Sequence, residues 1–168
     1  MLKPIHRRTP HAVRGLRFAI VASQYNALFV DAMLRAARAE LKLAGAKDIK
    51  VIRVPGAYEI PVVVARLART AALNQVTDSG RKRLSAIICL GVILRGQTVH
   101  ATHIGEAVSR ALMELQLRYE IPVIHEVLLL ENEDQARARC LSKTHNRGAE
   151  AAQTALAMAQ RMRKLEGL

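Results

Sequence analysis

Polar side chains follow an apolar run of this chain at the point where the run stops. Residues 94–100, LRGQTVH, come directly after the run SAIICLGVI. Such a run is typical of a strand that is buried on both faces of a parallel sheet. Because ligands of open α/β sheets bind beside the carboxyl ends of the strands, residues 94–100 form the first candidate site.

Residues 96–98 have the properties of an anion-binding turn. Gly96 lets the backbone approach a ligand, and Gln97 and Thr98 are expected to begin a helix whose free amide groups attract an anion. The hydroxyl of Thr98 adds a further donor. The turn matches neither GxxxxGK[ST] nor GxGxxG. Taken alone, it is explained more simply as a glycine turn whose threonine caps the helix.

His100 is the candidate for proton transfer. It lies two residues beyond the expected helix start, so its imidazole can reach back to the same turn. An unperturbed histidine has a pKa of about 6.5, which suits proton transfer at neutral pH. A histidine half buried on a helix is the alternative. His103 follows one turn later, but no carboxylate or thiolate at a suitable spacing completes a metal site, so we expect no metal.

Two other loops carry residues suited to a ligand. In VPGAYEIP, Glu59 stands at a helix start, where it would hydrogen-bond a polar ligand or only cap the helix. Tyr25 precedes Asn26 in the loop SQYNA, and its ring would stack on a flat heterocycle or lie at the edge of the core. If the strands are parallel, these loops and LRGQTVH gather at one edge of the sheet.

The rest of the sequence predicts the elements that position these loops. The C-terminal third, from Glu133, is expected to be helical with a break at 143–148, and 74–83 to be a polar surface loop. Apolar residues at helical spacing predict helices between the strands. The alternation predicts an α/β protein, a three-layer α/β/α sandwich of the flavodoxin-like kind with a mostly parallel sheet. Its four strands are expected at 16–22, 48–54, 85–93 and 121–130.

Length and composition predict one domain. The chain has 168 residues, of which 51% are hydrophobic and only 3% aromatic, so the core must consist of Ala, Val, Leu and Ile. We expect a basic N-terminal arm over 1–15, either disordered or pairing with a neighbouring subunit, and a single domain over 16–168.

Charge and cysteine content restrict the partners and the compartment. The net charge of +12 raises the question of a nucleic-acid partner. Outside the N-terminus and residues 81–83 the basic residues are scattered, and no aromatic residues are interleaved to stack on bases, so we expect no specific nucleic-acid binding. Cys89 and Cys140 form no disulfide or CxxC pattern. With no apolar stretch of roughly 20 residues and no signal-like N-terminus, we predict a cytoplasmic protein without a membrane partner.

Together these segments resemble the 6,7-dimethyl-8-ribityllumazine synthase family. The resemblance begins at about Leu16 and rests on ASQYN, VPGAYEIP, LGVILRGQTVH, IPVIHEVLLLENEDQA and the spacing of Arg139, Lys143 and NRG at 146–148. It implies a transferase of riboflavin biosynthesis that condenses 5-amino-6-(D-ribitylamino)uracil with 3,4-dihydroxy-2-butanone 4-phosphate. The products are the lumazine, phosphate and water, and the resemblance implies no cofactor.

The resemblance also assigns roles to matched positions. His100 matches the proton-transfer residue, while Gln97 and Thr98 match a phosphate-binding turn that is joined by Arg139 of the neighbouring subunit. Arg95 and Lys143 are further residues of the expected site. The expected substrate-binding residues are Tyr25 stacked on the pyrimidine, Asn26, Ala57, Tyr58 and Glu59 along the ribityl chain, and Val92, Ile93, Leu94 and His125 around the uracil.

The matched segments contain departures from the family pattern. His125 stands where the family usually has Phe, Leu129 and Leu130 replace a polar pair, and Thr102 and His103 replace an acidic and an aromatic residue. A non-catalytic lumazine- or flavin-binding storage protein on the same scaffold is therefore the alternative. A basic scaffold protein that binds polyanions is a third hypothesis.

The resemblance implies a homo-oligomer whose active sites are shared between subunits. The family unit is a pentamer, and the compact spacing of residues 139–148 is compatible with a shell of sixty subunits. Besides the small-molecule substrates, riboflavin synthase is a further partner that the resemblance suggests.

Overall fold

A parallel sheet forms the centre of the molecule. The computed structural model describes residues 13, 15–76 and 84–166. All neighbouring strands of the sheet run parallel, in the order β2-β1-β3-β4, so the predicted mostly parallel sheet is parallel throughout. The strands are β1 (Arg17–Ser23), β2 (Asp48–Val54), β3 (Leu84–Leu94) and β4 (Val123–Leu130).

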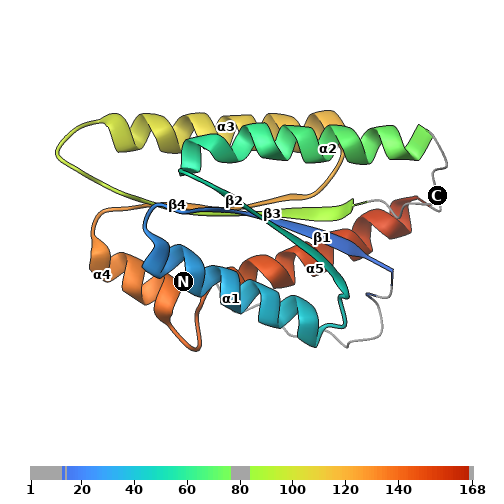
Figure 1. Ribbon diagram of the computed structural model, residues 1–168, viewed down its shortest axis with the longest axis horizontal. Helices are drawn as coiled ribbons and strands as arrows, with labels where there is room; N and C mark the ends of the chain where they lie inside the picture. The colour runs from blue at the N-terminus through green and yellow to red at the C-terminus, as the bar shows by residue number, and fades with distance from the viewer. Residues whose placement is uncertain (1–12, 14, 77–83, 167–168) are drawn as a thin grey trace.

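Helices cover both faces of the sheet, which confirms the predicted three-layer sandwich (Figure 1). One layer holds η2 (Ala57–Glu59), α2 (Ile60–Val76) and α3 (His100–Tyr119). The other holds α1 (Ala27–Leu43), α4 (Glu133–Ala136), the π-helical turn η3 (Arg137–Leu141) and α5 (Arg147–Leu165). We call these the α2/α3 layer and the α1/α5 layer.

Successive residues of the strands alternate between two apolar cores. On β1, Phe18 and Ile20 pack with the α1/α5 layer, whereas Ala19 and Val21 pack with the α2/α3 layer. On β3, residues 86–93 are all buried, as expected of a strand covered on both faces. Both cores consist mainly of aliphatic side chains, and they fix the helices on the two faces of the sheet.

Helices α1 and α5 approach each other very closely at Gly148. A Cβ added there would lie 2.0 Å from the backbone oxygen of Met33, a separation that no real side chain adopts. Asn146 caps α5 by accepting a hydrogen bond from Gly148 N at 2.9 Å. The residues along the contact are small, and Ala151, Ala152, Ala155 and Ala159 are buried.

The strand boundaries lie within two residues of prediction, and α5 begins at Arg147, inside the break predicted at 143–148. Two further differences concern α3 and α2. Helix α3 begins at His100, so Gln97 and Thr98 lie in the bend before it and do not begin the helix. Helix α2 continues to Val76, so the loop predicted at 74–83 does not begin before 77. Residues 77–83 lie outside the described part of the chain, as does most of the predicted arm at 1–15. Within the described residues, no helix is both long and apolar enough to span a bilayer.

Candidate active site

A cavity lies at the carboxyl edge of the sheet, between η2, the start of α3 and the ends of β1 and β3. Its volume is about 930 Å³, which suits one or two small organic molecules. We call it the carboxyl-edge cavity. Ten of the predicted site residues line it: Tyr25, Asn26, Ala57, Tyr58, Glu59, Val92, Ile93, Leu94, Thr98 and His100.

Tyr25 forms an exposed aromatic wall of this cavity. Its side chain is 70% exposed, which excludes the alternative of a core-edge residue. The neighbouring Asn26 adopts the left-handed conformation at φ 56°, and its Nδ2 donates a 2.8 Å hydrogen bond to the carbonyl oxygen of Val92. This bond ties the loop after β1 to the end of β3. The ring of Tyr25 lies against Gly56, where an added Cβ would come within 3.0 Å of it.

The carboxylate of Glu59 is suited both to capping the helix and to binding a ligand. Its Oε2 accepts a 2.8 Å hydrogen bond from the backbone N–H of Gly56 and so fixes the turn before η2. The other carboxylate oxygen has no hydrogen-bond partner among the residues that the structure describes. One oxygen therefore stabilises the local fold, and the second remains available to a hydroxyl group of a ligand.

His100 is the first residue of α3 and follows the predicted anion-binding turn at 96–98. Its backbone N–H approaches Thr98 Oγ1 at 3.4 Å, and both residues line the cavity. A Cβ at Gly96 would meet nothing within 4 Å, so the chain itself does not require glycine there. The free amide groups of the first turn of α3 lie at this end of the cavity, where an anion is stabilised.

Sequence analysis missed several residues that line the same cavity. These include Gly56, Ala101, Ile104 and Ala107, together with His103, which the sequence analysis did not assign to the substrate site. On α3 the signal was present, because positions 103, 104 and 107 share a helix face with His100 at spacings of 3, 4 and 7. Gly56 could be recognised only from its contacts with Tyr25 and Glu59.

Arg95 does not line the cavity, and its guanidinium pairs with Glu131 instead. Its NH1 contacts the two carboxylate oxygens of Glu131 at 3.0 and 3.1 Å, and its NH2 lies 3.4 Å from Thr102 Oγ1. These contacts join the end of β3 to the end of β4. Gln97 is exposed in the bend before α3 and is not among the lining residues of the cavity.

His125 lies on the edge strand β4, away from the carboxyl-edge cavity. Its Nε2 is 2.9 Å from Ser109 Oγ, and that hydroxyl donates to Gly105 O at 2.7 Å. Because the single hydroxyl proton is used in this way, His125 Nε2 must be the donor to Ser109. Partial desolvation of the ring lowers the pKa of His125. The imidazole is thus held in one orientation beside α3.

Arg139 and Lys143 are exposed and lie in the other layer. Arg139 belongs to η3, which packs against α1, α4 and α5, whereas the cavity is built from η2 and α3. Neither residue lines the cavity, and the described part of the chain offers Arg139 no ion-pair partner. The cavity of a single chain therefore contains the predicted aromatic, carboxylate and imidazole groups. It does not contain the predicted phosphate-binding guanidinium of Arg139, which lies in the other layer of the same chain.

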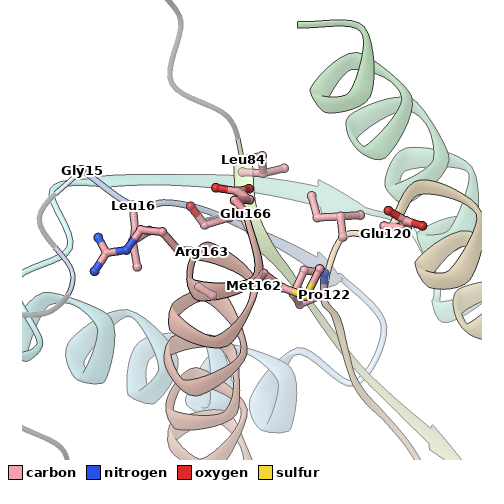
Figure 2. Close-up of a pocket in the computed structure, with 11 residues that line it drawn as sticks. Gly15, Leu16, Leu84, Glu120, Pro122, Met162, Arg163 and Glu166 are labelled. Carbon is pink, nitrogen blue, oxygen red and sulfur yellow. The ribbon is translucent and has the colours of Figure 1, made fainter. Parts of the chain in front are cut away.

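A second cavity, of about 400 Å³, lies at the opposite edge of the sheet (Figure 2). It is formed by the start of β3, the turn before β4 and the end of α5, with Leu84, Pro122 and Met162 among its walls. None of the predicted site residues lines it. It is also at the amino ends of the strands, where open α/β sheets do not usually bind their ligands.

Comparisons with known proteins place the chain in one family. The model of the 6,7-dimethyl-8-ribityllumazine synthase family matches residues 15–163. A relative of that name from Salinibacter ruber is 36% identical over 166 residues, covering 98% of this chain and 99% of its own. Relatives of the same name from Stenotrophomonas maltophilia and Xanthomonas oryzae are 39% and 40% identical, covering 94% and 89% of this chain and 94% and 91% of their own.

Proposed function

The chain belongs to the 6,7-dimethyl-8-ribityllumazine synthase family, and from this premise we propose that the carboxyl-edge cavity is its catalytic site. There it condenses 5-amino-6-(D-ribitylamino)uracil with 3,4-dihydroxy-2-butanone 4-phosphate, releasing phosphate and water. The observation that carries this proposal is the convergence of ten residues, predicted from three separate segments, on one cavity.

The cavity supplies a surface for each part of the uracil substrate. The exposed ring of Tyr25 stacks on the flat pyrimidine, and the end of β3 at Val92, Ile93 and Leu94 offers backbone groups to its polar edge. The ribityl chain lies along η2, where the second oxygen of Glu59 accepts a hydrogen bond from a hydroxyl. The hydrogen bond from Asn26 to Val92 holds the loop that carries Tyr25 against the end of β3.

Catalysis here consists mainly of holding two reactants together. The amine of the uracil substrate attacks the ketone, and imine formation, elimination of phosphate and ring closure follow, so no protein nucleophile is required. Placing both reactants in one site contributes up to roughly 7–11 kcal/mol through proximity. His100, at the phosphate end, transfers protons between the reacting groups and contributes a smaller factor of about 10²–10⁴.

The phosphate group binds at the bend of Gln97 and Thr98 and at Arg139 of the partner subunit. The separation of Arg139 and Lys143 from the cavity of their own chain supports a site completed by a second copy. His125, on the edge strand β4, faces the uracil of a neighbouring cavity in the same way. The active form is thus a homo-oligomer, a pentamer or a shell of sixty such subunits.

The remaining expectations form part of the same proposal. Residues 16–168 act as one domain in the cytoplasm. Riboflavin synthase, which consumes the lumazine, is a partner of this assembly.

The storage-protein alternative receives little support from the position of the departures. Thr102, Leu129 and Leu130 do not line the carboxyl-edge cavity. His103 does line it, and it adds a polar group without closing the space. His125 is the one departure assigned to the uracil, and it acts in a neighbouring subunit, so Tyr25, Glu59 and His100 remain together in the cavity.

The first experiment measures lumazine formation by the purified full-length protein, with both substrates, for wild type, His100→Ala and Arg139→Ala. We expect His100→Ala to lower kcat by about 100-fold or more, and Arg139→Ala mainly to raise KM for the butanone phosphate. Arg137→Ala is the matched control, because Arg137 is exposed and its one ion pair among the described residues is with Glu133, at 3.2 Å. Wild-type protein that binds lumazine without forming it above the uncatalysed rate would replace this proposal with the storage protein.

A mixing experiment tests whether the site is shared. His100→Ala and Arg139→Ala chains, unfolded and reassembled together in equal amounts, form about one quarter of their sites with both residues intact. At a butanone phosphate concentration far below the KM of Arg139→Ala, activity should therefore rise well above that of either variant alone. The control mixture, His100→Ala with the double variant, cannot form an intact site. If the first mixture assembles but stays as inactive as the control, Arg139 does not act across the interface.

A further inference from the structure

The direction of the Tyr25 ring is set by the backbone that carries it. The side chain is 70% exposed, so packing against neighbours contributes little to its orientation. The backbone of the Tyr25 loop, defined as residues 24–26, is instead bonded to the end of β2. Gln24 N donates to Val54 O at 2.8 Å. The amide of Tyr25 itself donates to Pro55 O at 3.0 Å. The end of β2 therefore holds the residue that forms the aromatic wall of the carboxyl-edge cavity.

One side chain of β2 contacts the chain on both sides of the Tyr25 loop. Arg53 NH2 donates a 2.8 Å hydrogen bond to the carbonyl oxygen of Ser23, the last residue of β1. Arg53 NH1 lies 2.5 Å from Oδ1 of Asp31, in the second turn of α1, and forms an ion pair with it. The Tyr25 loop runs between these two contacts. Arg53 therefore joins β1, β2 and α1 at the point where the chain leaves the sheet.

The carbonyl oxygen of Ser23 needs a hydrogen-bond donor. Ser23 is fully buried, and a buried backbone carbonyl without a hydrogen bond is costly. The pairing of β1 with β3 ends at Ala22 and Leu90, so no residue of β3 is paired with Ser23. On the β2 side the bond is made by the amide of the next residue. The guanidinium of Arg53 supplies a charge-assisted hydrogen bond to this oxygen. Its removal would take this partner from both the carbonyl and Asp31, and loosen the loop between them.

We propose that Arg53 is a positioning residue for the flat heterocycle in the carboxyl-edge cavity, because it fixes the two ends of the Tyr25 loop and so keeps the Tyr25 ring in the direction that stacks. This inference rests on the proposed function. Arg53 does not line the cavity, and it acts on the ligand only through Tyr25. Its removal therefore weakens the binding of the heterocycle and leaves the phosphate end of the site, at Thr98 and His100, unchanged.

The size of the effect follows from the fraction of molecules in which the ring is correctly placed. If this fraction falls to about one tenth in Arg53→Ala, the apparent dissociation constant of the heterocycle rises about tenfold. A bound substrate holds the ring in place, so kcat at saturation should stay within about twofold of wild type. The butanone phosphate does not stack on Tyr25, so its KM should also stay within about twofold. A general loss of stability or assembly would not separate the two substrates in this way.

Arg17→Ala is the matched control for Arg53→Ala. Arg17 Nε pairs with Asp48 Oδ2 at 2.6 Å, at the opposite end of β1 and β2. Its side chain is 32% exposed, close to the 29% of Arg53. Arg17 does not line the carboxyl-edge cavity. A variant that loses this Arg–Asp ion pair should therefore bind and turn over the substrates like wild type.

The first test measures the affinity of the assembled full-length protein for 6,7-dimethyl-8-ribityllumazine, by quenching of tyrosine fluorescence, together with KM for each substrate. We expect Arg53→Ala to raise the dissociation constant of the lumazine and the KM of the uracil substrate about tenfold, with no change in Arg17→Ala. An affinity and a KM of Arg53→Ala equal to those of wild type overturn the proposal. Wild type that binds the lumazine without forming it refutes the proposed function, and the affinities alone then decide the role of Arg53.

Hydrogen exchange followed by mass spectrometry tests the Tyr25 loop without any ligand. The amides of Gln24 and Tyr25 should exchange about tenfold faster in Arg53→Ala than in wild type, whereas residues 86–92 of β3 should exchange equally in both. Equal exchange of the loop amides in the two proteins overturns the proposal. If Arg53→Ala does not assemble, Arg53→Met replaces it in every measurement with the same expected results, because Met keeps a long unbranched side chain and has no donor.

Discussion

Replacing Gly148 by Ala should separate two helices that now touch backbone to backbone. The new methyl group would lie 2.0 Å from Met33 O, 2.5 Å from Met33 C and 2.6 Å from Met33 Cα, all of them backbone atoms of α1. To reach an ordinary contact of 3.4 Å, α5 would have to retreat by about 1.4 Å. No rotamer change relieves such a clash, so the cost lies at or above the upper end of the usual overpacking range, about 3 kcal/mol.

A helix usually gains stability when Gly is replaced by Ala, by about 1 kcal/mol. The net loss at Gly148 should thus be about 2 kcal/mol or more. Gly105 provides the matched control within α3, because a Cβ there meets Leu129 at 3.6 Å, an ordinary contact. Gly105→Ala should therefore be neutral or stabilising by up to about 1 kcal/mol.

Thermal unfolding followed by circular dichroism compares the two variants with wild type. Protein concentration and scan rate must be equal, because assembly and irreversibility both move the apparent midpoint. A loss of 2 kcal/mol corresponds to a decrease of roughly 4–8 °C for Gly148→Ala, with no decrease for Gly105→Ala. A Gly148→Ala protein with the wild-type midpoint would refute the close packing of α1 on α5.

The other two predictions concern buried polar and thiol groups. Ser23 is fully buried, and its hydroxyl has no partner among the described residues, so Ser23→Ala should raise the free energy of unfolding by about 1 kcal/mol in denaturant titrations. A comparable loss would show that this hydroxyl is satisfied. Burial raises the pKa of both Cys89 and Cys140, so a thiol reagent at about pH 8 should label native protein slowly and unfolded protein fully. Equal labelling rates in the two states would contradict this burial.

The fold was predictable because the apolar patterns are long and regular. In the strand expected at 85–93, residues 86–93 are all buried, and Val30, Met33, Ala37 and Leu41, which recur at helical spacing, are buried on α1. The start of α3 was not predictable in the same way. Val99 precedes the helix without a side-chain cap, so the bend at Gln97 and Thr98 carries no local signal that distinguishes it from a first turn.

The cavity was predictable for a different reason. Parallel strands end at one edge, so the residues after each strand meet there whatever the details of the loops. The direction of a long side chain depends on neighbours distant in the sequence, which is why the pairing of Arg95 with Glu131 escaped prediction. Glu126 offered a partial signal, since a carboxylate within a buried strand requires a cation, but only the fold identifies Arg147 as that cation.

The placement of the tyrosines gives the protein an optical probe of its own. The chain contains three Tyr and no Trp. Tyr25 and Tyr58 line the carboxyl-edge cavity, with exposed fractions of 70% and 63%. The intrinsic tyrosine fluorescence of the protein therefore comes mostly from the two rings that line this cavity, where a heteroaromatic compound would bind. Occupancy of the cavity can be followed by quenching of tyrosine fluorescence, without a label, in the same samples used for kinetics.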